Sequence, residues 1–306
     1  MTKIVSGLIM SVIIANGYWP LEKSQPLIDK TQTIRLAPDI SKLSDGERKA
    51  VVKLIEVGQI FQKLYEQQRH PEAVSAYRAL EQLNKQKNGA PATQNLVTLY
   101  RLFQGPIATT LENKREPFLP VEALKPGKNM YPWGITKEEV EQVITSAPNP
   151  DEKRNELLDL RAVVRWVNAK NVREDIAKLN KYPALQTLHP NLLDQLQRLT
   201  PRGATASGKT GLYAVPYSVA YADELIKAHG LLNEAANAVE KDDDEFARFL
   251  RNRARDLLSN DYESGDASWV TGRFKNLNAQ IGSYETYDDE LYGVKTFFSF
   301  VLLQSR

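Results

Sequence analysis

The sequence predicts a mainly α-helical protein with a small β element, which is an α+β fold. Two helix starts are marked by capping boxes, in which Ser44 is followed by Glu47 and Thr136 is followed by Glu139. Hydrophobic residues then recur at helical spacing over most of the chain. The segment 268–284 mixes aromatic and β-branched residues with Gly and Asn at short intervals, which predicts the β element.

Length and composition already exclude several classes of protein. The chain has 306 residues, enough for about two domains or lobes. Its 42% hydrophobic and 25% charged residues are typical of a folded globular chain and exclude general disorder. The net charge is only +2, so we expect no nucleic-acid partner. The absence of Cys excludes disulfides, a thiolate nucleophile and Cys-ligated zinc.

The first residues have the pattern of an export signal. Lys3 precedes the apolar run 4–15, and the small residues Ala15 and Gly17 lie at its end. About 20 apolar residues are needed to cross a bilayer, so we expect no transmembrane span. We predict a signal peptide over residues 1–17 and a periplasmic or secreted protein. A buried N-terminal strand or helix and an uncleaved anchor are the alternatives.

The rest of the chain divides into an entry segment and a long helical region. Residues 18–43 contain Pro20, Pro26 and Pro38, which predict an extended entry segment without a helix. Residues 44–306 are expected to be mainly helical, in one or two lobes, with an irregular crossing at 105–135. The helical patterns cover 44–69, 73–87, 93–103, 136–146, 191–199, 219–237 and 242–258. Between 146 and 191, a charged stretch at 151–155 has a hydrophobic continuation at 157–167, after which the helical pattern resumes through 184. A last apolar helix or strand covers 294–303.

Residues 203–210 match the phosphate-loop pattern G-x-x-x-x-G-K-[ST]. Such a loop connects a buried strand to a helix whose N-terminus meets the phosphates. Here the preceding residues 192–200 have helical spacing, and Gly211 and Pro216 interrupt any helix that follows. A Gly-, Ser- and Thr-rich loop is therefore favoured, and nucleotide binding is kept as a third hypothesis for function.

The histidines give no metal-binding pattern. His70, His189 and His229 are the only three, and their spacing does not fit a helical zinc motif. We expect structural roles, with His70 and His189 in loops or at helix ends and His229 as a C-terminal residue of its helix. A Ser-His-Asp site converges only in space and stays open, although no G-x-S-x-G elbow is present.

Two segments combine carboxylates with aromatic residues. They are 260–269 (NDYESGDASW) and 281–291 (IGSYETYDDEL). Such a cluster could hold a cation or an amine. A polar helix cap is the alternative for each segment, but two such segments close together indicate a polar cleft.

These two segments resemble the dipeptidyl-peptidase-III family of zinc metallopeptidases, especially its shorter bacterial members. Three further blocks resemble the same family, namely 43–66, 126–139 (PGKNMYP followed by TKEE) and 213–218 (YAVPYS). The likeness extends over residues 38–303. It implies a two-lobed fold in which helical lobes, with a small β-barrel-like portion, flank a wide cleft.

The resemblance also implies a peptide or small amide-like substrate, and a zinc ion held by His-Glu-x-x-Gly-His and a later glutamate. In the family these ligands follow the ETY block, whereas this sequence ends at Arg306. We therefore expect no metal ligand, no catalytic residue and no cofactor in this chain, with zinc implied only for the complete fold. The ETY block lines the cleft, which assigns Glu285 and Tyr287 to substrate contact, with Asp261 and Asp266 as supporting acids.

The sequence closes on the apolar stretch 297–303, which we expect a partner to cover. A truncated or frameshifted product, the first half of a split enzyme with a complementary C-terminal half, and a stand-alone binding lobe remain open. The first hypothesis is the N-terminal portion of an exported zinc-dependent peptidase-like hydrolase that is inactive alone. The alternative is a non-catalytic peptide-binding or scaffold protein of the cell envelope.

Overall fold

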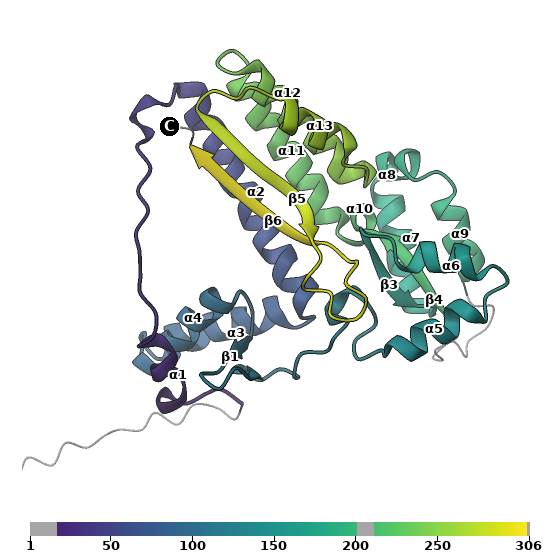
Figure 1. Ribbon diagram of the computed structural model, residues 1–306, viewed down its shortest axis with the longest axis horizontal. Helices are drawn as coiled ribbons and strands as arrows, with labels where there is room; N and C mark the ends of the chain where they lie inside the picture. Colours follow the sequence, from purple (N-terminus) through teal and green to yellow (C-terminus); the bar gives the residue numbers. More distant parts are fainter. Residues whose placement is uncertain (1–16, 201–210, 305–306) are drawn as a thin grey trace, which may run out of the picture. The chain divides into compact units, whose positions relative to one another are not determined.

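The computed structural model describes residues 17–200 and 211–304 (Figure 1). The chain forms two compact units. The first contains the N-terminal residues up to Arg35 together with Glu72–Leu124, and the second contains Leu36–Pro71 and Lys125–Arg306. The predicted signal peptide, apart from Gly17, and the phosphate-loop match at 203–210 lie outside the described residues.

The first unit is built from three helices and a small hairpin. These are α1 (Leu21–Ile28), α3 (Ala73–Gln86), α4 (Pro91–Phe103), β1 (Ile107–Thr109) and β2 (Arg115–Pro117). The two strands pair antiparallel. A separate apolar core joins these elements, with Trp19 edge-on to Phe118 at 6.1 Å between ring centroids.

Helix α1 corrects the prediction of an extended entry segment at 18–43. Pro20 is the N-cap and lies before the helix, where a missing N–H costs nothing. Pro26 lies inside the helix and removes one intrahelical hydrogen bond. Burial of Ser24 and Leu27, in a helix packed against α4, offsets that loss. The β1–β2 hairpin likewise lies within the predicted irregular crossing at 105–135.

The second unit contains most of the helices. They are η1 (Ile40–Lys42), α2 (Asp45–Arg69), η2 (Lys128–Met130), α5 (Lys137–Thr145), α6 (Pro150–Leu157), α7 (Ala169–Lys181), α8 (Pro183–Leu188), α9 (Leu192–Leu199), α10 (Tyr217–Ala220), α11 (Ala222–Val239), α12 (Asp244–Ser259) and α13 (Glu263–Thr271). Both predicted capping boxes are present, at the starts of α2 and α5. The sequence prediction of a mainly helical fold is confirmed.

Two antiparallel strand pairs complete this unit. Strand β3 (Ala162–Trp166) pairs with β4 (Leu212–Pro216), and β5 (Leu277–Glu285) pairs with β6 (Phe297–Gln304). The hydrophobic continuation noted at 157–167 therefore contains a strand from residue 162 onwards. Val163 and Val164 are buried β-branched residues in β3, and a partner strand distant in the sequence pairs with them.

The predicted β element at 268–284 is correct only in its second half. Residues up to Thr271 continue α13, and the strand begins at Leu277. The apolar stretch at 297–303 forms β6, so the strand alternative of the prediction holds. A helix precedes the phosphate-loop match and a strand follows it, which is the reverse of the strand-loop-helix order that such a loop requires.

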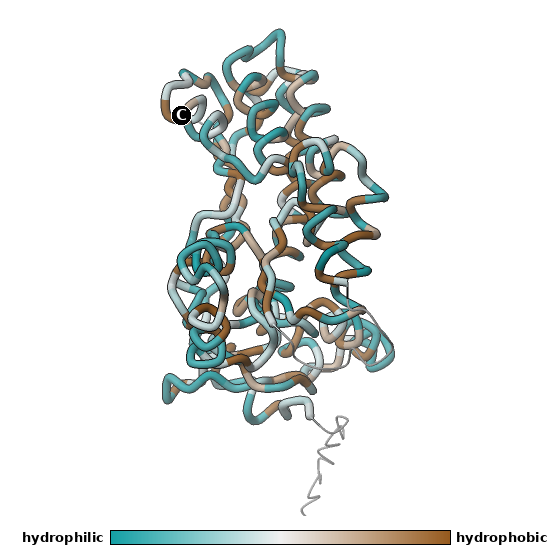
Figure 2. The backbone as a smooth tube through the Cα atoms, turned by 90° about the vertical axis from the view of Figure 1, so that its right-hand side faces the viewer, coloured by the Kyte–Doolittle hydropathy of each residue, from teal (hydrophilic) through white to brown (hydrophobic). Residues whose placement is uncertain are grey.

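The core of the second unit lies between long helices and the β5–β6 pair. Helices α2, α11 and α12 pack together, and β6 lies along α2 (Figure 1). Along the helical turns of the chain, brown hydrophobic and teal hydrophilic residues follow one another, as is typical of amphipathic helices (Figure 2). Phe61 of α2 contacts Phe298 and Phe300, and Gly58 lets the Phe300 ring approach α2 closely.

Helix α2 of the same chain therefore covers part of the apolar stretch 297–303, for which a partner was expected. Phe297 and Phe298 are buried by it, whereas Val301 and Leu303 remain 41% and 56% exposed. Over the residues that the structure describes, no helix combines the length and hydropathy needed to cross a membrane.

Candidate functional site

The two acid-and-aromatic segments flank strand β5. The segment 260–269 covers the start of α13, and the segment 281–291 covers the end of β5 and the loop that leads to β6. Glu285, the last residue of β5, together with the loop 286–296 that follows it, is here called the acidic loop. Its two aspartates are buried, with Asp288 and Asp289 7% and 4% exposed, whereas Glu285 and Glu290 are exposed.

Asp289 fixes the backbone of the acidic loop. Its carboxylate accepts hydrogen bonds of 2.9–3.2 Å from the backbone N–H groups of Leu291, Tyr292, Val294 and Lys295. The Tyr131 hydroxyl donates a further hydrogen bond to Oδ2 at 3.2 Å. Burial beside this carboxylate raises the pKa of Tyr131, which therefore stays protonated and donating. The loop is consequently held in one conformation by a single side chain.

Asp288 attaches the same loop to distant elements. It accepts a hydrogen bond of 2.7 Å from the Tyr65 hydroxyl of α2 and another from Nζ of Lys128 in η2. Arg69 Nε lies 3.6 Å from its Oδ1. Burial alone would raise the pKa of Asp288, but hydrogen bonding to Lys128 and its positive charge outweigh burial, so the pKa is lowered and the carboxylate is charged.

Glu285 and Tyr287 are the two predicted contact residues, and both point to solvent. Tyr287 is 72% exposed and Glu285 is also exposed. Partial burial, followed by the charges of Asp288 and Glu285, raises the pKa of the Tyr287 hydroxyl, so it is a donor at neutral pH. The arrangement presents a carboxylate and a phenol on a loop that Asp288 and Asp289 hold from beneath.

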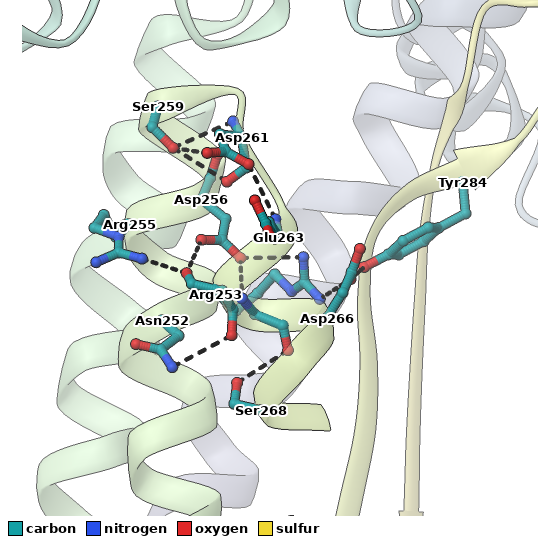
Figure 3. A network of polar contacts seen from close by, with 12 residues as sticks. Asn252, Arg253, Arg255, Asp256, Ser259, Asp261, Glu263, Asp266, Ser268 and Tyr284 are labelled. Carbon is teal, nitrogen blue, oxygen red and sulfur yellow. Dashed lines mark hydrogen bonds and ion pairs between the residues drawn. The ribbon is translucent and has the colours of Figure 1, made fainter. Parts of the chain in front are cut away.

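The structure gives Asp266 a different position from Asp261. Asp266 accepts hydrogen bonds from Arg253 Nη2 at 2.7 Å and from the Tyr284 hydroxyl at 2.6 Å (Figure 3). Tyr284 immediately precedes Glu285, so Asp266 links α13 to the strand that carries the predicted contact residues. Burial, then hydrogen bonding to Asp266, raises the pKa of Tyr284. A cavity of about 260 Å³ lies beside this link, lined by both residues and by apolar side chains.

Asp261 is an exposed residue of the turn between α12 and α13. Its carboxylate accepts a hydrogen bond from the Glu263 N–H at 3.0 Å, and its own N–H donates to Ser259 Oγ at 3.2 Å (Figure 3). Both contacts are local. The polar helix cap, given above as the alternative for this segment, therefore describes Asp261.

Sequence reasoning missed the residues that hold these segments in place. Asp256 is buried in α12 and accepts hydrogen bonds from Ser264 Oγ and the Gly265 N–H. Lys128 and Tyr131 belong to the PGKNMYP block quoted above, but its spacing carries no signal that they contact the acidic loop. Lys128 has a backbone φ of +46°, in the left-handed region that L-residues rarely adopt. The ammonium group that bonds Asp288 is therefore carried by a residue with a strained backbone conformation.

The histidines lie apart, as their spacing predicts. Nε2 of His189 is 2.7 Å from Ser218 Oγ and 3.0 Å from the Leu258 carbonyl. Ser218 is fully buried, and among the described residues no carboxylate hydrogen-bonds to His189, so this pair does not form a nucleophilic site. His229 lies in the middle of α11 and bonds Asn233, which corrects its predicted place at a helix end.

A metal site is not formed by the described part of the chain. Residues 17–200 and 211–304 contain no group of three or more His, Asp or Glu side chains placed to hold an ion. The acidic loop has several carboxylates, but Asp288 and Asp289 already use their oxygens on protein donors. Of the two exposed carboxylates, Glu290 Oε1 lies 3.6 Å from Nζ of Lys128, and Glu285 points to solvent.

The sequence and the fold were compared with those of known proteins. No protein-family profile matches the chain. Among curated proteins, Nudix hydrolase 3 of Arabidopsis thaliana is 24% identical over 286 residues, covering 90% of this chain and 36% of that protein. The chain therefore spans little more than a third of the length of this relative.

Two solved structures share the fold. Dipeptidyl-peptidase III from Corallococcus sp. strain EGB has a TM-score of 0.69 and 23% identity, covering 93% of this chain and 44% of that one. Dipeptidyl-peptidase III from Caldithrix abyssi has the same TM-score and 21% identity, covering 92% and 43%. The chain has the fold of dipeptidyl-peptidase III over nearly all of its own length and less than half of theirs, consistent with an N-terminal part only.

Proposed function

We propose that this chain supplies the peptide-contacting wall of a dipeptidyl-peptidase-III-like hydrolase, with the zinc ligands contributed by a complementary C-terminal part. The observation that carries the proposal is the construction of the acidic loop on this fold. Asp288 and Asp289 hold it through buried contacts, and Glu285 and Tyr287 extend from it into solvent. A preorganised loop binds without the entropic cost of ordering itself.

The proposed ligand group is the N-terminal ammonium of a peptide. An enzyme that releases dipeptides has to recognise a free N-terminus, and a carboxylate is the natural partner of an ammonium. Glu285 would accept from the ammonium, and Tyr287 would donate to a peptide carbonyl. Asp266 supports this site from behind by fixing Tyr284 next to Glu285.

Peptide binding tests the proposal directly. We expect the full chain to bind a tetrapeptide with a free N-terminus at least about tenfold more tightly than its N-acetylated form, because a charged hydrogen bond is lost. Glu285→Gln should abolish this difference, and Tyr287→Phe should weaken binding of both peptides. Glu263→Gln, an exposed acid on α13, is the matched control and should change neither. Equal affinity for both peptides would contradict the proposed role of Glu285.

Complementation tests the hydrolase part of the proposal. The DNA that follows the codon for Arg306, read in three frames, is the first place to search for His-Glu-x-x-Gly-His and a later glutamate. If the motif is present, the two purified products should bind one zinc ion per pair and release dipeptides only together. If it is absent but the peptides bind as above, the chain acts as a peptide-binding protein of the cell envelope, and the hydrolase part of the proposal is wrong.

The proposed location is outside the cytoplasm. Residues 1–17 have the charge, apolar run and small residues of a signal peptide. Fusion of residues 1–30 to a phosphatase that is active only after export should give activity. Replacement of Leu8 and Ile9 by Asp should abolish it. An inactive fusion would leave the chain inside the cell.

A further inference from the structure

A second cavity, of about 390 Å³, lies in the second unit and takes no part in the proposed peptide site. It is here called the β3 cavity. Its walls come from the segment 129–133, from strand β3, from α7 and from Tyr221. Its volume is within the range of small-molecule sites, about 300–1,000 Å³. Two of the four tryptophans of the chain, Trp133 and Trp166, line it and are half-buried.

Two amide side chains in the β3 cavity are oriented with their oxygens available. Nδ2 of Asn129 donates to the Gln67 carbonyl at 2.8 Å, and Nδ2 of Asn171 donates to the Trp166 carbonyl at 2.9 Å. Because Nδ2 is the donor in both bonds, they assign the Nδ2 and Oδ1 positions of each amide. Within the described ranges, neither Oδ1 atom accepts a hydrogen bond. The cavity therefore has two preset acceptors.

The charged groups of the cavity are nearly balanced. Nη1 of Arg165 donates a hydrogen bond of 2.7 Å to the fully buried carboxylate of Asp175. The other N–H groups of this guanidinium bond no other described residue. Glu174 is exposed and forms no ion pair or hydrogen bond with any residue that the structure describes. Donors and acceptors thus stand together with little net charge beside the two indoles.

These groups limit the kind of ligand that the cavity can bind. An anion would be repelled by the carboxylate of Glu174, and a cation would be repelled by the guanidinium of Arg165. A neutral molecule with several hydroxyls can donate to the Asn oxygens and Glu174 and accept from Arg165, while its C–H face lies on an indole. We propose that the β3 cavity is a binding site for a neutral sugar of one or two rings.

The test uses the full chain and four probes: glucose, N-acetylglucosamine, maltose and cellobiose. Binding is followed by tryptophan fluorescence and by saturation-transfer NMR. We expect at least one probe to bind, and we expect Asn171→Ala and Trp166→Leu each to weaken it by about tenfold. Trp269→Leu removes a half-exposed indole outside the cavity and should leave the affinity unchanged. Circular dichroism checks that each variant folds, and Asn129→Ala gives a second test of the same acceptors.

Any one of four results would overturn the proposal, and the tetrapeptide result is the fourth. The first is that no probe binds more tightly than about 10 mM. The second is that Trp269→Leu weakens binding as much as Trp166→Leu. The third is that tetramethylammonium binds in place of the sugars and is lost in Glu174→Gln, which would make the cavity an amine site. A tetrapeptide that displaces the sugar and loses affinity in Asn171→Ala would assign the cavity to the peptide cleft instead.

Discussion

The Tyr65 hydroxyl donates a 2.7 Å hydrogen bond to Asp288, which joins the longest helix of the chain to the acidic loop. Burial, together with the charge of Asp288, raises the pKa of Tyr65 although Arg69 opposes this, so the hydroxyl remains a donor. Lys128 approaches the same carboxylate from η2 and is 1% exposed. Asp288 therefore connects α2, η2 and the acidic loop, which are far apart in sequence. These contacts also hold the backbone next to the exposed Tyr287.

Asp288→Asn should destabilise the protein strongly. The substitution removes the nearer of the two carboxylates beside the buried ammonium of Lys128 and leaves only Glu290 Oε1, at 3.6 Å, as a counter-charge. Breaking a buried pair in this way costs about 3 kcal/mol. Urea unfolding followed by circular dichroism measures the change. Glu285→Gln alters an exposed carboxylate at the end of β5 and should shift the unfolding free energy by less than about 0.5 kcal/mol. Equal effects of the two variants would mean that Asp288 does not anchor the loop.

Local signals in the sequence were sufficient to predict most of the helices. They were not sufficient to predict contacts between residues that are far apart in the sequence. The Ser44 and Glu47 capping box is a contact between residues three apart, so the sequence shows it directly. Lys128 and Asp288 are 160 residues apart, and nothing in the spacing of either predicts their contact. The same reason explains why strand β3 was not predicted, because its partner strand β4 is distant in the sequence.

From the sequence, only exposed residues of the candidate site were assigned. Glu285 and Tyr287 were assigned from the resemblance and stay a prediction, and the structure shows that both lie at the surface next to the buried Asp288 and Asp289. Asp261 and Asp266 look equivalent in sequence, being acids five residues apart among aromatic residues. Tertiary contacts separate them, because Asp266 reaches Arg253 and Tyr284 whereas Asp261 bonds only its own turn.

A double-mutant cycle should distinguish these two acids. Asp266→Asn and Tyr284→Phe remove the two sides of one hydrogen bond, so their effects on the unfolding free energy should be non-additive by about 1 kcal/mol. Asp261→Asn combined with Tyr284→Phe is the control pair and should be additive. Additivity in both cycles would show that the Asp266 contact contributes nothing to stability.

Two glycines in helices should respond to alanine in opposite directions. A Cβ at Gly46 in α2 would lie 2.2 Å from Asp242 Oδ2 and 2.4 Å from the Ala238 carbonyl oxygen, so Gly46→Ala must separate α2 from α11. A Cβ at Gly230 in α11 meets nothing within 4 Å. Gly230→Ala should therefore raise the unfolding free energy by up to about 1 kcal/mol, from helix propensity alone. Thermal unfolding of both variants tests the pair, and stabilisation by Gly46→Ala would contradict the close helix contact.

Lys295 should make stability depend on pH. Its ammonium is buried and donates to the carbonyls of Leu157 and Asp159 at 2.7 Å. Burial lowers the pKa of Lys295 from its ordinary value of 10.5 to about 7, although the charges of Asp159 and Asp289 oppose this. Between about pH 7 and pH 10.5 the unfolded chain therefore binds one more proton at this residue than the folded chain. The folded state consequently gains stability from Lys295 as the pH rises through that window.

Comparison of the protein with Lys295→Met isolates this contribution. The difference in unfolding free energy between the two proteins should change by about 2 kcal/mol in favour of the lysine protein from pH 6.5 to pH 9. Other titrating groups are common to both proteins and cancel in the difference. Lys227→Met replaces an exposed lysine of α11 and should give a difference that is flat over the same range. A flat difference for Lys295→Met as well would mean that the ammonium stays charged in the folded state, held by the two carbonyls despite its burial.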